Sequence, residues 1–108
     1  MRTLTWYLAS VGPGANQKET YRLDRGYNPV RVWMHSDAVP IDQELLVDIN
    51  VDGVSIFSYQ PRMRDEKDMD STDFAVAQLN EGALVTLDVD QQGGNTRGLT
   101  VGLELEEA

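Results

Sequence analysis

The sequence predicts an all-β protein: a single-domain antiparallel β-sandwich of about seven or eight strands, jelly-roll-like or immunoglobulin-like. Apolar residues alternate with polar ones at a period of two along most of the chain, and no stretch keeps helical spacing beyond a turn or two. Turn-forming residues interrupt this alternation at short intervals. A small β-barrel is the second architecture that fits the pattern.

Length and composition limit the classes of function. The 108 residues form one domain, residues 1–108, because the chain is too short for two independent cores. Acidic residues outnumber basic ones 18 to 9, and the resulting charge of −9 disfavours binding to nucleic acid. The chain has no cysteine for a disulfide or a thiolate, and no apolar run is long enough for a signal peptide or a membrane span. We therefore expect a soluble protein that binds neither nucleic acid nor membrane.

Two strands are predicted in the first third of the chain. Residues 3–8 alternate, with Leu4, Trp6 and Leu8 on one face, and a Gly-Pro-Gly cluster at 12–14 ends the strand. Residues 28–34 form the second strand, which places Val32 on one face and Trp33 on the other.

A β-hairpin is predicted over residues 45–57. Asp52 and Gly53 supply the two positive φ angles of a type I′ turn, and a two-residue turn fixes the register of both strands. Val51 then faces Val54, and Asp48 faces Phe57. The expected apolar face comprises Leu45, Val47, Ile49, Val51, Val54 and Ile56.

The second half of the chain contains a polar run between strands. Residues 62–73 are too polar for a core, so they predict a long solvated loop or one short helical turn. Residues 73–77 predict a short strand. Residues 84–90 and 99–105 predict two strong strands, because their apolar residues alternate strictly.

The string from Asp48 to Gly53 resembles the first half of a calcium-binding loop. An EF-hand needs a bidentate glutamate at its twelfth position, where this chain has Tyr59, and its flanks must be helices. The EF-hand is therefore rejected. A looser Ca²⁺ site remains open if the two acidic strand faces are neighbours, with Asp48, Asn50, Asp88 and Asp90 as its ligands.

No catalytic constellation is evident in the sequence. His35 is the one histidine, and it stands beside Ser36 and Asp37. Adjacent residues of a strand point to opposite faces, so these side chains cannot form a catalytic relay with one another. We expect no enzymatic activity and assign no catalytic residue.

Several apolar residues fall on strand faces opposite the expected core. A second layer within the domain and a contact with another subunit explain such residues equally well. The candidate interface residues are Trp33, Leu46, Phe57 and Tyr59.

Residues 38–105 carry an ordered series of short motifs that resembles a β-sandwich module of tailed-bacteriophage virion proteins. The series consists of Ala38-Val39-Pro40, the segment from Glu44 to Asn50, Asp52-Gly53, Ser55-Ile56-Phe57, Leu79 to Gly82, Leu87 to Gln91 and Gly98 to Val101. It departs from the family pattern after Gly82, where an acidic residue is missing, and in the strong charge of residues 62–73.

The resemblance implies a structural role on a virus particle. The expected protein is a small accessory subunit that decorates and stabilises the head, is assembled into the virion in the host cytoplasm, and binds the major capsid protein or other virion proteins. We expect an oligomer, with a trimer as the favoured form. A neck, tail, baseplate or fibre component is the alternative, and a carbohydrate-binding adhesion module is a third. Residues 1–37 have no counterpart in the family and are the expected place for an attachment arm or edge strand.

Overall fold

The computed structural model describes residues 1–108 and contains nine strands and no helix. The strands are β1 (Arg2–Ser10), β2 (Tyr21–Arg22), β3 (Tyr27–Ser36), β4 (Leu45–Val51), β5 (Val54–Ser55), β6 (Arg62–Met63), β7 (Asp68–Ser71), β8 (Leu84–Gln91) and β9 (Arg97–Glu107). The count exceeds the expected number because β2, β5 and β6 are only two residues long. No helical segment has the length and apolar character needed to span a lipid bilayer.

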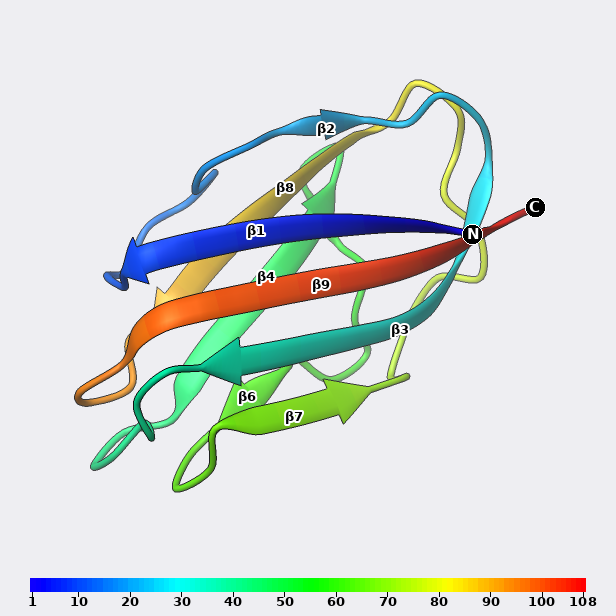
Figure 1. Ribbon diagram of the computed structural model, residues 1–108. Coiled ribbons are helices and arrows are strands. Elements are labelled where there is room, and N and C mark those ends of the chain that lie inside the picture. The colour runs from blue at the N-terminus through cyan, green and yellow to red at the C-terminus, as the bar shows by residue number, and fades with distance from the viewer.

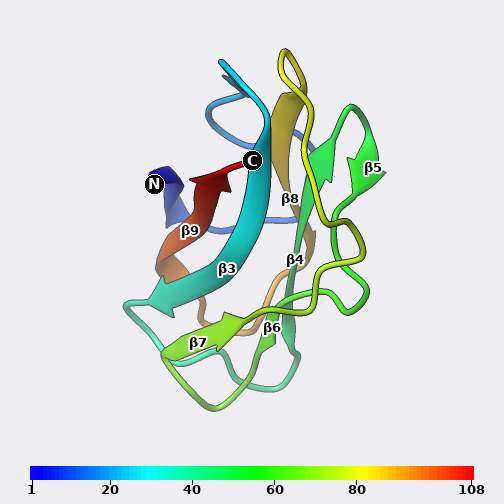
Figure 2. The ribbon, with the colours of Figure 1, turned by 90° about the vertical axis from the view of Figure 1, so that its right-hand side faces the viewer.

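The strands form two antiparallel sheets that pack face to face, so the predicted β-sandwich is confirmed. The first sheet has the order β1-β9-β3-β7, and we call it the β9 sheet. The second has the order β2-β8-β4-β5, with β6 paired to β4, and we call it the β8 sheet. Figure 1 shows the β9 sheet in front and the β8 sheet crossing behind it, and Figure 2 shows the two layers on edge.

The core fills the space between the sheets. Every long strand buries one face, as the alternation of apolar and polar residues predicts. Strand β9 lies between β1 and β3, and the side chains that it turns inward are fully buried. The largest contributions come from Leu4, Trp6 and Leu8 of β1, Leu45, Val47 and Ile49 of β4, Val85, Leu87 and Val89 of β8, and Leu99, Val101, Leu103 and Leu105 of β9.

The predicted hairpin turn is confirmed. Asp52 has a φ of 51° and Gly53 a φ of 83°, as a type I′ turn requires. Val51 pairs with Val54, and the turn also reaches β8, since the Asp52 carboxylate accepts a hydrogen bond of 3.0 Å from the Leu84 amide. Val54 is 67% exposed, however, so the expected apolar face is interrupted at the turn and resumes at Ile56, which is buried in the core. The returning strand ends at Ser55, so Phe57 does not pair with Asp48.

The prediction of a solvated loop or a short helical turn at residues 62–73 is wrong. This segment contains β6 and β7, and Met63 of β6 is buried in the core. Strand β7 pairs with β3 at the edge of the β9 sheet, where alternate Asp side chains stay in solvent. The strand expected at residues 73–77 is also absent, and only Phe74 makes a single bridge there, to Phe57. The composition of the β7 segment predicts a loop. It forms a strand because it pairs with β3, which lies far away in the sequence.

One glycine is required by the packing of an aromatic ring. Trp33 and Gly102 are paired across β3 and β9, and both are on the outer side of the sheet. A Cβ atom at Gly102 would overlap the Trp33 indole, so the ring lies directly over the glycine backbone. An aromatic residue that covers a cross-strand glycine is a recognised way to stabilise a sheet.

We predict that Gly102→Ala lowers the free energy of unfolding by about 1–3 kcal/mol, because the new methyl group must displace the Trp33 ring. Urea titration followed by circular dichroism measures the change. Gly12→Ala is the matched control, since no atom lies within 4 Å of an added Cβ there. A Gly102→Ala variant as stable as Gly12→Ala would contradict the packing described.

Candidate functional site

The four residues of the conditional Ca²⁺ site do lie together on the outer face of the β8 sheet. Strands β4 and β8 are neighbours, and Asp48 stands directly opposite Asp88. Asn50 lies two residues along β4 from Asp48, and Asp90 occupies the register shift of β8 between Val89 and Gln91. This arrangement satisfies the first condition for the looser metal site.

Hydrogen bonds already occupy these carboxylates. Asp88 accepts one bond of 2.9 Å from the Asn16 amide and another of 2.6 Å from the Asn50 side chain. Ser55 donates to Asp48 at 2.6 Å, and Gln60 donates to Asp90 at 2.6 Å. The donors Asn16, Ser55 and Gln60 belong to the segments that flank the two central strands. Asp48, Asp88 and Asp90 therefore bind the segments at both borders of the β8 sheet to its two central strands.

The geometry favours this structural role over metal binding. No group of three His, Cys, Asp or Glu side chains is arranged to hold a metal ion. Calcium prefers six to eight oxygen ligands, and here oxygens that would serve as ligands accept N–H or O–H bonds.

Asp48 is nevertheless electrostatically unusual. Burial of its carboxyl raises the pKa of Asp48, the hydrogen bond from Ser55 opposes that effect, and the negative charges of Asp90 and Asp88 raise it further. No Lys or Arg forms an ion pair with these three aspartates. The native state therefore bears an electrostatic cost when Asp48 is ionised.

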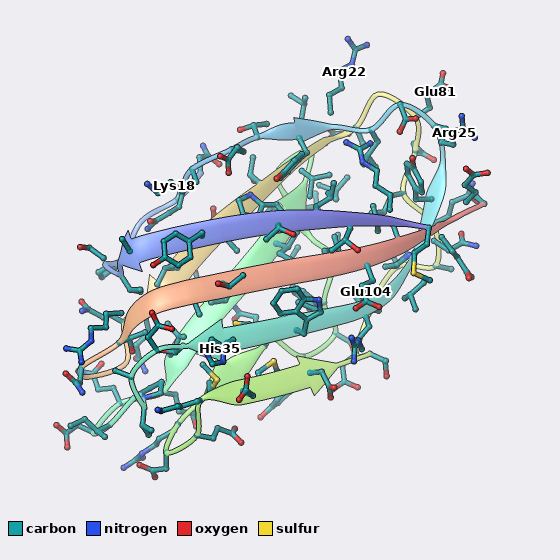
Figure 3. All side chains as sticks on the ribbon, viewed as in Figure 1. Lys18, Arg22, Arg25, His35, Glu81 and Glu104 are labelled. Carbon is teal, nitrogen blue, oxygen red and sulfur yellow. The ribbon has the colours of Figure 1, made fainter.

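A second polar cluster lies on the outer face of the β9 sheet, around Trp33. Arg31 of β3 forms an ion pair of 2.7 Å with Glu104 of β9 and another of 3.3 Å with Asp70 of β7. The same β3 face carries His35, whose Nδ1 lies 2.6 Å from Asp68. His35 and Glu104 are labelled on this face in Figure 3. Together these side chains surround the Trp33 indole with charged and hydrogen-bonding groups.

Shallow hollows lie on both sides of β7. One, of about 340 Å³, is lined by Trp33, Met34, Asp68, Met69 and Asp70. A larger groove of about 640 Å³ runs along the other side, between residues 59–62 and 66–73, and it is mostly polar. Met69 and Asp70 border both.

The four candidate interface residues occupy different environments. Phe57 is only 8% exposed and stacks on Phe74 at 5.6 Å between ring centres, so it belongs to the core. Leu46 and Trp33 are half-buried on opposite sheets. Tyr59 is exposed, and the guanidinium of Arg62 lies 4.1 Å from its ring centre. These residues do not form one continuous patch.

The residues beside His35 do not form a catalytic relay. Ser36 points into the protein, is fully buried, and donates a hydrogen bond of 2.6 Å to the Ala38 carbonyl. His35 points outward to Asp68 and Asp37. The side chains alternate across the strand, as the sequence predicts.

Sequence reasoning missed the partners of Trp33. The alternation of β3 predicts that Arg31 shares a face with Trp33. The polar composition around Asp68 and Asp70 predicts a loop, however, and nothing in their local sequence indicates pairing with β3. Gly102 was likewise not recognised as the residue beneath the indole.

Comparisons with protein-family models, curated proteins and solved structures each gave no match to this chain.

We predict that Asp48→Asn stabilises the protein at neutral pH, because the substitution removes a charge that is costly in the folded state. The gain should be only a fraction of a kcal/mol, since solvent screens this half-buried carboxyl. A raised native pKa means that the folded state holds this proton more tightly than the unfolded state, so stability falls as the pH rises through the interval between the two pKa values. The variant keeps the oxygen that accepts from Ser55 but has no charge to desolvate.

Thermal melting at about pH 7 and about pH 3 tests this expectation. The stabilisation should be present at the higher pH and absent at the lower one, where aspartate is protonated in both states. Glu106→Gln, at an exposed position near the end of β9, is the control and should change neither melting temperature. Destabilisation by Asp48→Asn at about pH 7 would contradict the electrostatic cost.

Proposed function

We propose that this protein is a structural component of a tailed-bacteriophage virion, a small accessory subunit that decorates the head and binds the major capsid protein or other virion proteins. The observation that carries the proposal is the ordered motif series of residues 38–105. Three motifs of the series contain residues with positive φ angles. Asp52-Gly53 makes the hairpin turn, Gly82 has a φ of 80°, and Gly98 has a φ of 58°.

The architecture suits such a subunit. The strands are joined into a two-layer body, and both outer faces present side chains held by hydrogen bonds or ion pairs. A decorating subunit binds a shell that offers many equivalent sites, so modest contacts in each copy still give high occupancy when copies are linked. An oligomer is therefore the expected form.

Co-sedimentation with empty heads of the phage that encodes the chain tests this function. We expect saturable sedimentation with heads, at a fixed number of copies for each head. A chain that stays in the supernatant at every head concentration would contradict head decoration. Imaging of the assembled particle then separates the head from the neck, tail, baseplate or fibre, since the density of the domain would lie at one of these places.

A second candidate function, carbohydrate binding, is favoured by the surroundings of Trp33. The indole lies over Gly102, and Asp68 and Asp70 line the hollow beside it. An aromatic plate stacks on the apolar face of a sugar ring, while carboxylates accept bonds from its hydroxyl groups. The negative charge of the chain favours a neutral glycan over an anionic one.

Electrophoresis through gels that contain neutral polysaccharides tests the second function. Trp33→Ala should weaken the retardation by about tenfold, a loss of roughly 1.4 kcal/mol. Leu84→Ala is the control, because Leu84 is an exposed apolar residue on the other sheet, away from both Trp33 and β1. Equal mobility with and without polysaccharide, in gels of glucan, galactan and mannan, would exclude this function.

A further inference from the structure

The four borders of the two sheets differ in how they are protected against pairing with another chain. The β8 sheet is bordered by β2, β5 and β6, each of two residues. The free border of the β9 sheet at β7 is four residues long and carries Asp68 and Asp70. Short strands and charged side chains are the usual protection of a sheet edge. Three borders are therefore protected.

Strand β1 forms the fourth border and is neither short nor rich in charge, although residues 19–24 contact it at Arg2, Thr5 and Trp6. It runs for nine residues, and Arg2 is its only charged residue. In Figure 1 it forms the outermost strand of the front sheet, and its sole strand neighbour is β9. A long edge strand rich in Thr, Leu and aromatic residues is a template for another strand.

The register shows which peptide groups of β1 are free. The Ser36 amide donates to Lys67, so Ser36 faces the β7 side, and His35 consequently faces β9. His35 pairs with Thr100, so the next residue, Val101, faces β1 and pairs with Trp6. By the same alternation, the peptide groups of Thr3, Thr5 and Tyr7 point away from the sheet.

An independent contact agrees with this assignment. The Tyr21 hydroxyl, from the opposite sheet, donates a hydrogen bond of 2.6 Å to the Thr5 carbonyl. The hydroxyl occupies one of the two lone pairs of that oxygen, so the carbonyl can accept a second bond. No backbone group pairs with the amides of Thr3, Thr5 and Tyr7.

We propose that β1 pairs with β1 of a second copy of this chain, in antiparallel orientation around a twofold axis near Thr5. The register with Thr5 opposite Thr5 places Thr3 opposite Tyr7 and Leu4 opposite Trp6. It also places Arg2 opposite Leu8, so the one charge of the strand does not face its own copy. Thr–Thr and aromatic–β-branched pairs are favourable across strands.

The self-complementary pattern of β1 is the reason for choosing a second copy as the occupant. Outward residues meet outward residues, so the two β9 sheets join into one continuous sheet, while Leu4, Trp6 and Leu8 stay covered by their own chain. A twofold contact uses the same surface on both partners and closes at two subunits. The species in solution is then a dimer. The family resemblance, in contrast, leads to the expectation of a trimer. This inference depends on β1 alone and is independent of the virion proposal.

Thr5→Pro tests the interface without cutting a bond of the fold. Proline removes the Thr5 amide hydrogen, which points to the free edge, and leaves the β1–β9 ladder intact. Light scattering should give the wild type twice the 12.1 kDa mass of the chain and give Thr5→Pro a single chain mass. Thr5→Ala keeps the amide and should remain a dimer.

Amide exchange in the wild type gives a second readout that does not depend on a variant folding. The amides of Thr3, Thr5 and Tyr7 should become protected as the protein concentration rises, while those of Leu4, Trp6 and Leu8 stay protected throughout. A monomeric wild type, or a dimer whose Thr3, Thr5 and Tyr7 amides exchange freely, would overturn the proposal. Head co-sedimentation is measured separately, so failure of one proposal is distinguishable from failure of the other.

Discussion

The register of β4 governs the chemistry of both faces of the β8 sheet. Asp52 and Gly53 adopt positive φ angles that close a two-residue turn, and the turn is also tied to Leu84 at the start of β8. A slip of one residue would exchange the buried and exposed sides of the strand. Val47 and Ile49 would then enter solvent, and the acidic side chains would enter the core.

Once this register is set, the outer faces acquire their polar organisation. Asp48 falls opposite Asp88, an unfavourable pair of like charges that is offset by hydrogen bonds from the flanking segments. The resulting network holds the irregular borders of the sheet in place. A string that resembles half of a calcium loop thus acts mainly as a turn and a fastening point.

The β9 sheet carries an aromatic residue on its outer face, and this residue packs against the sheet itself. Trp33 lies on the outer face and covers the backbone of Gly102, and the Arg31–Glu104 ion pair and the His35–Asp68 hydrogen bond lie on the same face. The same arrangement that stabilises the sheet also leaves a flat ring beside the carboxylates of β7. The long border at β1 is the other accessible feature of this sheet, and it offers peptide groups instead of side chains. The proposed assembly edge and the proposed ligand site are therefore separate places on one layer.

Sequence alone determined the class of fold, the hairpin with its turn, and the buried side of each long strand. These features are local, because alternation at a period of two and a pair of positive φ angles depend only on residues that are adjacent in the sequence. Only the tertiary structure decided that β7 forms from a polar run, that Val54 is exposed, and that Phe57 packs on Phe74. It also decided that Asp48 meets Asp88 and that β1 lies at an open edge. Each of these depends on which distant strand lies alongside, and cross-strand partners are set by the packing of the two sheets as a whole, which no short stretch of sequence encodes.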